Sequence, residues 1–172
     1  MNEATRLALV ALGDTCARHV IEKLRREVQR IESADDADSI RDHVVDAFCT
    51  AWHMHQWVWD AICEKPDLKL AVLRYRGFEH QTIENHETFG AVLAGRFVPL
   101  KICRMIATSS RYVHVLSTAE HANTSVADPA ANGSSVRSKP MVIVMGRPIA
   151  ATRLLVEVDD YWVTMILDCG IE

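Results

Sequence analysis

The segment from Phe48 to Asp60 constrains the fold most, because it carries three of the chain's four tryptophans and two of its eight histidines. A helix over residues 40 to 64 would align six residues along one seam at alternating spacings of three and four: Val45, Phe48, Trp52, His55, Trp59 and Ile62. A second, patchier apolar surface would be separated from that seam by a narrow polar strip; the surface carries Met54, Trp57 and Ala61, and the strip carries Asp46, Cys49, His53, Gln56 and Asp60. The pattern predicts a helix covered on two sides.

Helical spacing elsewhere predicts four more helical segments. Residues 3 to 32 form a long amphipathic pattern that would run antiparallel to the helix over residues 40 to 64, for which Ser39 is the predicted N-cap. Pro66 stops that helix and opens the next, which is expected over residues 68 to 75. A short helix over residues 83 to 93 and another over residues 99 to 111 follow.

The C-terminal third changes character. Branched and aromatic residues predict strands over residues 112 to 116 and 141 to 145, followed by a turn at Gly146, Arg147 and Pro148. Residues 151 to 169 form an amphipathic helix with Gly170 as its C-cap. The predicted fold is mainly α, a bundle of five to six helices with a small C-terminal β hairpin, in a single domain over residues 1–172 (1–116 helical bundle, 117–140 loop, 141–172 strand plus C-terminal helix).

Composition limits the class of function. The chain is 49% hydrophobic and 24% charged with a formal net charge of −4, so it lacks the global basic surface of many nucleic-acid binders. Neither a signal segment nor a membrane span is visible, which predicts a cytoplasmic protein with no membrane partner. Five scattered cysteines predict free thiols rather than a disulfide framework or a zinc ribbon, and no phosphate loop, nucleophile elbow or cofactor motif is present.

The two histidines of the central segment invite a metal hypothesis. On a helix, His53 and His55 point about 160° apart and cannot bind one ion together. Cys49 and His53, four residues apart, could, but they supply only two of the three or four ligands that zinc needs. Cys49 and His53 are therefore weak metal candidates, and His55 is predicted to stay neutral while it donates to a carbonyl or carboxylate.

Two basic groups of residues are candidates for phosphate chemistry. Arg74 and His80 have the Arg-x(4 to 6)-His spacing of HEPN ribonucleases, in which the arginine holds the phosphate and the histidine transfers a proton. Gly77 interrupts this stretch, and the alternative is a solvated helix end. The second group would form a basic strip, or else a solvated helix face; its members are Lys101, Arg104, Arg111 and His114.

Residues 43 to 169 resemble a family of small, uncharacterised bacterial helical proteins that is distantly HEPN-like. The segment from Ala51 to Trp57 is similar to that family's motif Ala-Trp-His-x-x-Asp-Trp, with Gln56 in place of the aspartate. The segment from Cys103 onward is similar to the motif Cys-Arg-Asp-Ile-Ala-Asn-x-x-Lys-His. That second motif is loosely similar to the Asn-x-x-x-His segment of HEPN domains, which are often dimers that act as RNases or as nucleotide-binding partners in toxin and antiphage systems.

The second motif departs from the family where chemistry would need it. Arg104 matches, but Met105, Thr108, Arg111 and Tyr112 replace the motif's Asp, Asn, Lys and His. The general acid or base candidate is therefore missing, unless His114 has taken its place.

These patterns favour a non-catalytic interaction or binding module, since the titratable groups do not assemble into a nucleophile, base and oxyanion set. Its predicted ligand-binding residues are Lys101, Arg104 and Arg111. A HEPN-like ribonuclease or toxin-type protein is the first alternative, with candidate catalytic residues Arg74, His80, Arg104, Arg111 and His114; a metal-binding helical protein is the second. The predicted partners are a second copy of the chain, because the helix over residues 40 to 64 is apolar on two sides, or another protein, with RNA less favoured by the net charge.

Overall fold

The computed structural model describes residues 16–108, 115–116, 140–144 and 146–171. The described part of the chain is mainly helical, as the sequence predicts, with a small antiparallel sheet. Its elements are α2 (Ala17–Ser33), α3 (Ala37–Ile62), α4 (Pro66–Tyr75), α5 (His86–Arg96), α6 (Val98–Thr108), β1 (Val115–Leu116), β2 (Met141–Val144), β3 (Arg147–Ala150) and α7 (Ala151–Cys169).

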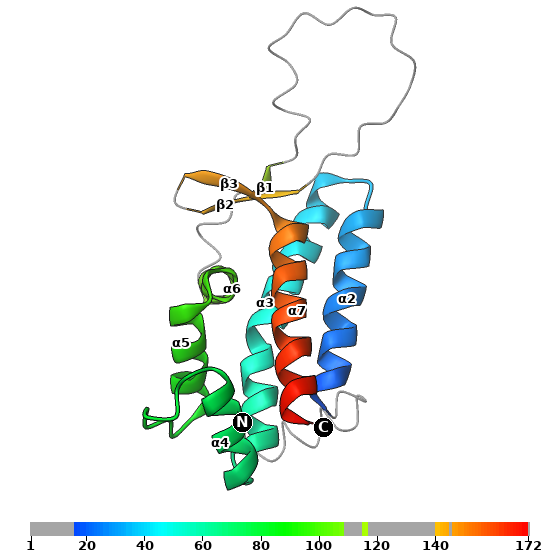
Figure 1. Cartoon of the computed structure of the whole chain (residues 1–172). Helices are drawn as coiled ribbons and strands as arrows, with labels where there is room; N and C mark the ends of the chain where they lie inside the picture. Colours follow the sequence, from blue (N-terminus) through cyan, green and yellow to red (C-terminus); the bar gives the residue numbers. More distant parts are fainter. Residues whose placement is uncertain (1–15, 109–114, 117–139, 145, 172) are drawn as a thin grey trace, which may run out of the picture.

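Helix α3 is the centre of the bundle. Helices α2 and α7 run along one side of it, and α4, α5 and α6 lie on the other side (Figure 1). Its predicted seam is buried at Phe48, Trp52, His55, Trp59 and Ile62, whereas Val45 at its upper end is half-buried. On the second surface Met54 is buried, and Trp57 and Ala61 are half-buried. The prediction of a helix covered on two sides is confirmed, and helices of the same chain provide the cover.

The hairpin of α2 and α3 turns at Ala34 to Asp36. The carboxylate of Asp36 accepts a hydrogen bond from the backbone N–H of Ser39 at 2.8 Å, so Asp36 is the N-cap and α3 begins at Ala37. The prediction of Ser39 as the cap is wrong by one helical turn. Asp36 and Ser39 both belong to the cap-forming residue types, and a helix that starts at Ala37 lets the N–H of Ile40 donate to the carbonyl of Asp36 at 3.0 Å.

Three strands form the sheet, in the order β1, β2, β3, and all pairs are antiparallel. The pairing of the two predicted strand segments is confirmed at Val115 and Leu116. Strand β3 was predicted as a turn because it contains Pro148, which pairs with Ile143. Since β3 lies at the edge of the sheet, a proline there can leave its missing N–H on the unpaired side. The reversal between β2 and β3 occurs at Gly146, whose φ is +76°.

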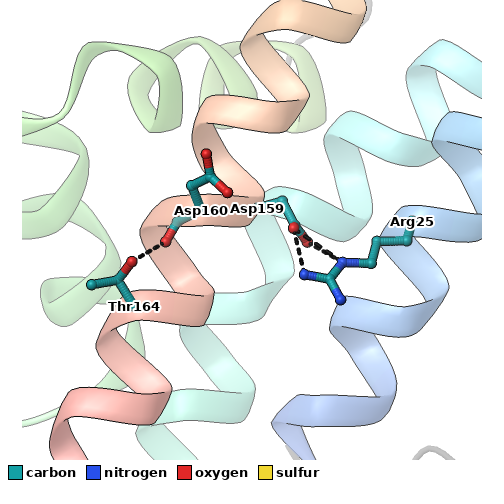
Figure 2. A network of polar contacts seen from close by, with 4 residues as sticks. All are labelled: Arg25, Asp159, Asp160 and Thr164. Atoms are coloured by element: carbon teal, nitrogen blue, oxygen red, sulfur yellow. Dashed lines mark hydrogen bonds and ion pairs between the residues drawn. The ribbon is translucent and has the colours of Figure 1, made fainter.

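Helix α7 covers α2 and α3. The indole N–H of its buried Trp162 donates to the carbonyl of Ala51 at 3.0 Å. One turn away, Figure 2 shows Asp159 pointing toward α2, where both carboxylate oxygens accept hydrogen bonds from Arg25 at 2.8 to 3.2 Å. The neighbouring Asp160 lies on the side away from Arg25, and its carbonyl accepts from the Thr164 hydroxyl at 2.6 Å. Burial of Trp162 therefore anchors α7, and the exposed ion pair of Arg25 with Asp159 adds about 1 kcal/mol or less.

The predicted ends of α4 and α7 match the structure. Pro66 occupies the first turn of α4, and Gly170 adopts the left-handed conformation that closes α7, with φ of +67°. None of the described helices is long and apolar enough to cross a membrane. All five cysteines are described and none forms a disulfide, although only Cys103 is fully buried and Cys63 is exposed.

Candidate functional site

Helix α5 packs against α3 at Gly90. A Cβ atom at this position would lie 2.6 Å from Cδ2 of His55 and 2.9 Å from Cη2 of Trp52, well inside van der Waals contact. Glycine is therefore required for α5 to rest on these two rings. The ring centroids of Trp52 and His55 are 4.2 Å apart, so the two side chains form one packed pair under α5.

His55 is buried with its ring nitrogen bonded to the protein backbone. Nδ1 lies 2.6 Å from the carbonyl oxygen of Trp52, and because a carbonyl can only accept, Nδ1 carries the proton. Burial lowers the pKa of His55 to about 4, assisted by the nearby His86, His53 and Arg104. His55 is neutral at physiological pH, as the sequence predicts, and its protonated nitrogen is bonded to the backbone.

Arg104 projects from α6 beside this pair. The guanidinium carbon of Arg104 lies 5.6 Å from the centroid of the Trp52 ring, within the range of a cation–π contact. Lys101 lies one turn earlier, and both side chains are exposed. Neither cation has a carboxylate partner among the residues that the structure describes. The structure thus brings two of the predicted basic residues together on the exposed face of α6, where Arg104 lies next to an aromatic ring.

The same helix exposes apolar side chains. Val98 is 66% exposed and Met105 is 40% exposed, and they are separated by two helical turns with Lys101 between them. The sequence of α6 contains no acidic residue. We call Val98, Lys101, Arg104 and Met105 the α6 outer face. It combines positive charge with apolar area, and sequence reasoning identified only its two cations.

The second pair of candidates, Arg74 and His80, is not on one helix. Arg74 lies in the last turn of α4, which ends at Tyr75, and Gly77 reverses the chain with φ of +70°. His80 follows in the loop, where its side chain is 94% exposed and its nearest ionic contact is Glu79 at 3.8 Å. The two side chains therefore belong to a helix end and a solvated loop, rather than to two turns of one helical face.

Arg76, which the sequence analysis did not single out, fastens this loop to α7. Its guanidinium donates to the carbonyl of Tyr161 at 2.9 Å and lies 3.8 Å from the centroid of that ring. Tyr161 in turn stacks on Phe97 at 4.4 Å, and burial raises its pKa to about 12. These contacts are typical of a structural role, in which Arg76 holds the end of α4 against α7.

Among the described residues, Cys49 and His53 do not gather a third metal donor. Cys49 is half-buried and His53 is exposed, and burial raises the pKa of the Cys49 thiol, which disfavours the thiolate that binds metal. In the described ranges, one group of three donor side chains does converge, and it consists of Glu27, His43 and Asp46. Sequence reasoning missed it, although Glu27 interrupts the apolar seam of α2 between Leu24 and Ile31.

Two predicted residues, Arg111 and His114, lie outside the described residues. Comparison of this chain with models of protein families, with curated proteins and with solved structures finds no match.

Proposed function

We propose that this chain is a non-catalytic binding module that recognises an acidic protein segment through the α6 outer face. The observation that carries the proposal is Arg104, a cation next to Trp52 that lacks a carboxylate partner in the described part of the chain. Lys101 beside it shares this property. Two neighbouring cations that lack a carboxylate partner among the described residues favour an anionic partner.

The exposed apolar residues of the face favour a protein over RNA. Burying a Val or Met side chain contributes about 1.5–3 kcal/mol, whereas an exposed ion pair contributes about 1 kcal/mol or less. Val98 and Met105 would therefore supply most of the affinity, and Lys101 and Arg104 would select an acidic segment. RNA binding usually rests on many cations, and the net charge of −4 does not favour it.

The titratable groups near Arg104 support a binding role over catalysis. His55 is neutral and bonded to the backbone, and Arg74 and His80 lie on different local structures. Among the described residues, Arg104 lies against Trp52 and its carbonyl accepts from the Thr108 hydroxyl, and neither contact brings an exposed general base to it.

A binding measurement tests the proposal. A fluorescent peptide of alternating glutamate and leucine should bind the full chain, and a peptide with lysine in place of glutamate should not. Lys101→Glu combined with Arg104→Glu should weaken binding by at least about tenfold, because like charges replace complementary ones. The matched control, Arg41→Glu with Arg153→Glu, makes the same charge change at exposed sites on α3 and α7 and should leave the affinity unchanged.

Two outcomes would refute the proposal. One is a binding result without charge selectivity, which means either equal binding of both peptides or equal effects of the two double variants. The other is cleavage of RNA by the purified protein that is abolished by Arg104→Ala, which would establish the ribonuclease alternative. His80→Ala and Arg111→Ala in the same assay separate the two candidate catalytic groups.

A homodimer stays a prediction, but the two apolar sides of α3 no longer provide the reason for it. Both apolar surfaces of α3 are covered by helices of the same chain, so a second copy would have to use another surface. Sedimentation of wild type and of the Lys101→Glu, Arg104→Glu double variant tests whether that surface is the α6 outer face. We also propose a cytoplasmic location, which five unpaired cysteines support.

A further inference from the structure

A buried carboxylate on α2 faces a histidine and an aspartate on α3. Glu27 is 5% exposed although it is acidic, and its Oε1 accepts a hydrogen bond from Nη1 of Arg30 at 2.7 Å. Its second oxygen, Oε2, accepts no hydrogen bond from any described residue. An unsatisfied buried carboxylate oxygen is costly, so a native structure that retains one calls for a partner.

The side chains that face this oxygen are metal-binding types. Nδ1 of His43 lies 3.7 Å from Oε2, which is beyond hydrogen-bond length, and Asp46 completes a group whose donor atoms all lie within 4.8 Å of one another. Donor atoms bound at about 2.0–2.1 Å to one tetrahedral ion lie about 3.3 Å apart. The histidine and glutamate atoms are already near that separation, and exposed Asp46 can close the rest by rotating its side chain.

From this geometry we infer that Glu27, His43 and Asp46 bind a divalent first-row transition-metal ion such as Zn²⁺. One imidazole and two carboxylates suit this class of ion, and three protein ligands leave a coordination position for water. Arg30 holds the other oxygen of Glu27, as outer-shell partners of ligating carboxylates do. With neutral His43, the four side chains sum to one negative charge, which suits a cation.

The site has a structural consequence for the α2–α3 hairpin. Glu27 belongs to α2, whereas His43 and Asp46 lie one turn apart on α3. An ion bound to all three would join the two helices near their connecting turn and would stabilise the folded chain, because the unfolded chain lacks the assembled site. This inference is independent of the proposed role of the α6 outer face.

Metal titration of the full, untagged chain tests the site. After chelator treatment, equilibrium dialysis against Zn²⁺ and elemental analysis should find one ion per chain, and Zn²⁺ should raise the melting temperature. His43→Ala and Asp46→Asn should each lower the Zn²⁺ affinity by at least about tenfold and remove the melting shift. These positions are half-buried and exposed, so both variants should fold, whereas Glu27→Gln tests the buried ligand once circular dichroism shows that it folds.

Matched controls exclude other donors. His53→Ala removes an exposed histidine from the same helix, and Cys63→Ser removes the exposed thiol; neither should change Zn²⁺ affinity. Bound Co²⁺ should give a visible absorption spectrum that His43→Ala changes and His53→Ala does not. The inference is overturned if wild type binds no stoichiometric Zn²⁺. It is also overturned if affinity falls in His53→Ala or Cys63→Ser but not in His43→Ala.

Discussion

Replacing Gly90 by alanine tests the packing of α5 against α3. The added Cβ would lie 2.6 Å from Cδ2 of His55 and 2.9 Å from Cη2 of Trp52. Carbon atoms in contact are about 3.5–4.0 Å apart, so the methyl group would overlap the two rings by at least about 0.9 and 0.6 Å. Neither ring can retreat easily, because both are buried and His55 is tied to the backbone by a 2.6 Å hydrogen bond.

Two opposing terms set the size of the effect. Alanine gains about 0.8–1.0 kcal/mol over glycine within a helix, whereas overpacking a core usually costs about 1–3 kcal/mol. Overlap with two fixed rings places the cost at the upper end of that range. We therefore expect Gly90→Ala to lower the free energy of unfolding by about 2 kcal/mol, which corresponds to a fall in melting temperature of about 4–8 °C.

Gly95 offers a matched control on the same helix. A Cβ there meets nothing within 4 Å, so Gly95→Ala should raise the free energy of unfolding by about 0.5–1 kcal/mol. Urea unfolding followed by circular dichroism measures both variants. In the double variant Gly90→Ala with His55→Ala, the loss of unfolding free energy should be smaller than the sum of the two single losses by about 1 kcal/mol or more, because the added methyl group no longer meets the imidazole. If Gly90→Ala is as stable as wild type, or if both glycine variants shift stability in the same direction, the described contact of α5 with α3 is wrong.

Three further predictions concern buried groups. Burial lowers the pKa of His55 to about 4, whereas an unfolded histidine titrates near about 6.5. The contribution of neutral His55 to the free energy of unfolding is therefore complete above about pH 6.5 and falls toward about pH 4. Wild type should lose about 2 kcal/mol of unfolding free energy between about pH 7.5 and about pH 5, and His55→Gln should lose clearly less. A thiol reagent should modify exposed Cys63 in the folded protein and buried Cys103, whose pKa burial raises, only after denaturation; equal rates would contradict the packing. Trp162→Phe should cost about 2 kcal/mol through its lost 3.0 Å hydrogen bond and lost volume, and half-buried Trp57→Phe less; equal losses would place Trp162 outside the core.

Local signals in the sequence predict much of this fold. The boundaries of α7 follow from its amphipathic spacing and from Gly170, and Pro66 marks the start of α4. Strand β3 escaped prediction because the pairing tolerance of Pro148 depends on its edge position, which is a property of the assembled sheet. The cap of α3 was misplaced at Ser39 because several neighbouring residues could cap the helix with similar energies.

The site was less predictable than the fold, for a physical reason. The helical spacing of residues 99 to 111 predicts that Arg104 is exposed. Its contact with Trp52, however, depends on how α6 packs against α3. Glu27 could have been noticed as a charge in an apolar seam, yet its pairing with His43 requires the register of α2 against α3. Side-chain spacing describes one helix, whereas these sites form between helices.

The contacts of α7 have a consequence for how the chain reaches its fold. Arg25 and Asp159 are 134 residues apart in sequence, and Trp162 is 111 residues from the carbonyl that it bonds. The α2–α3 hairpin can form early from local contacts, but the apolar face that it presents to α7 stays uncovered until α7 arrives. During synthesis the apolar residues of α2 and α3 that face α7 therefore remain exposed to solvent until α7 has been made. Docking of α7 should be the slow step of folding.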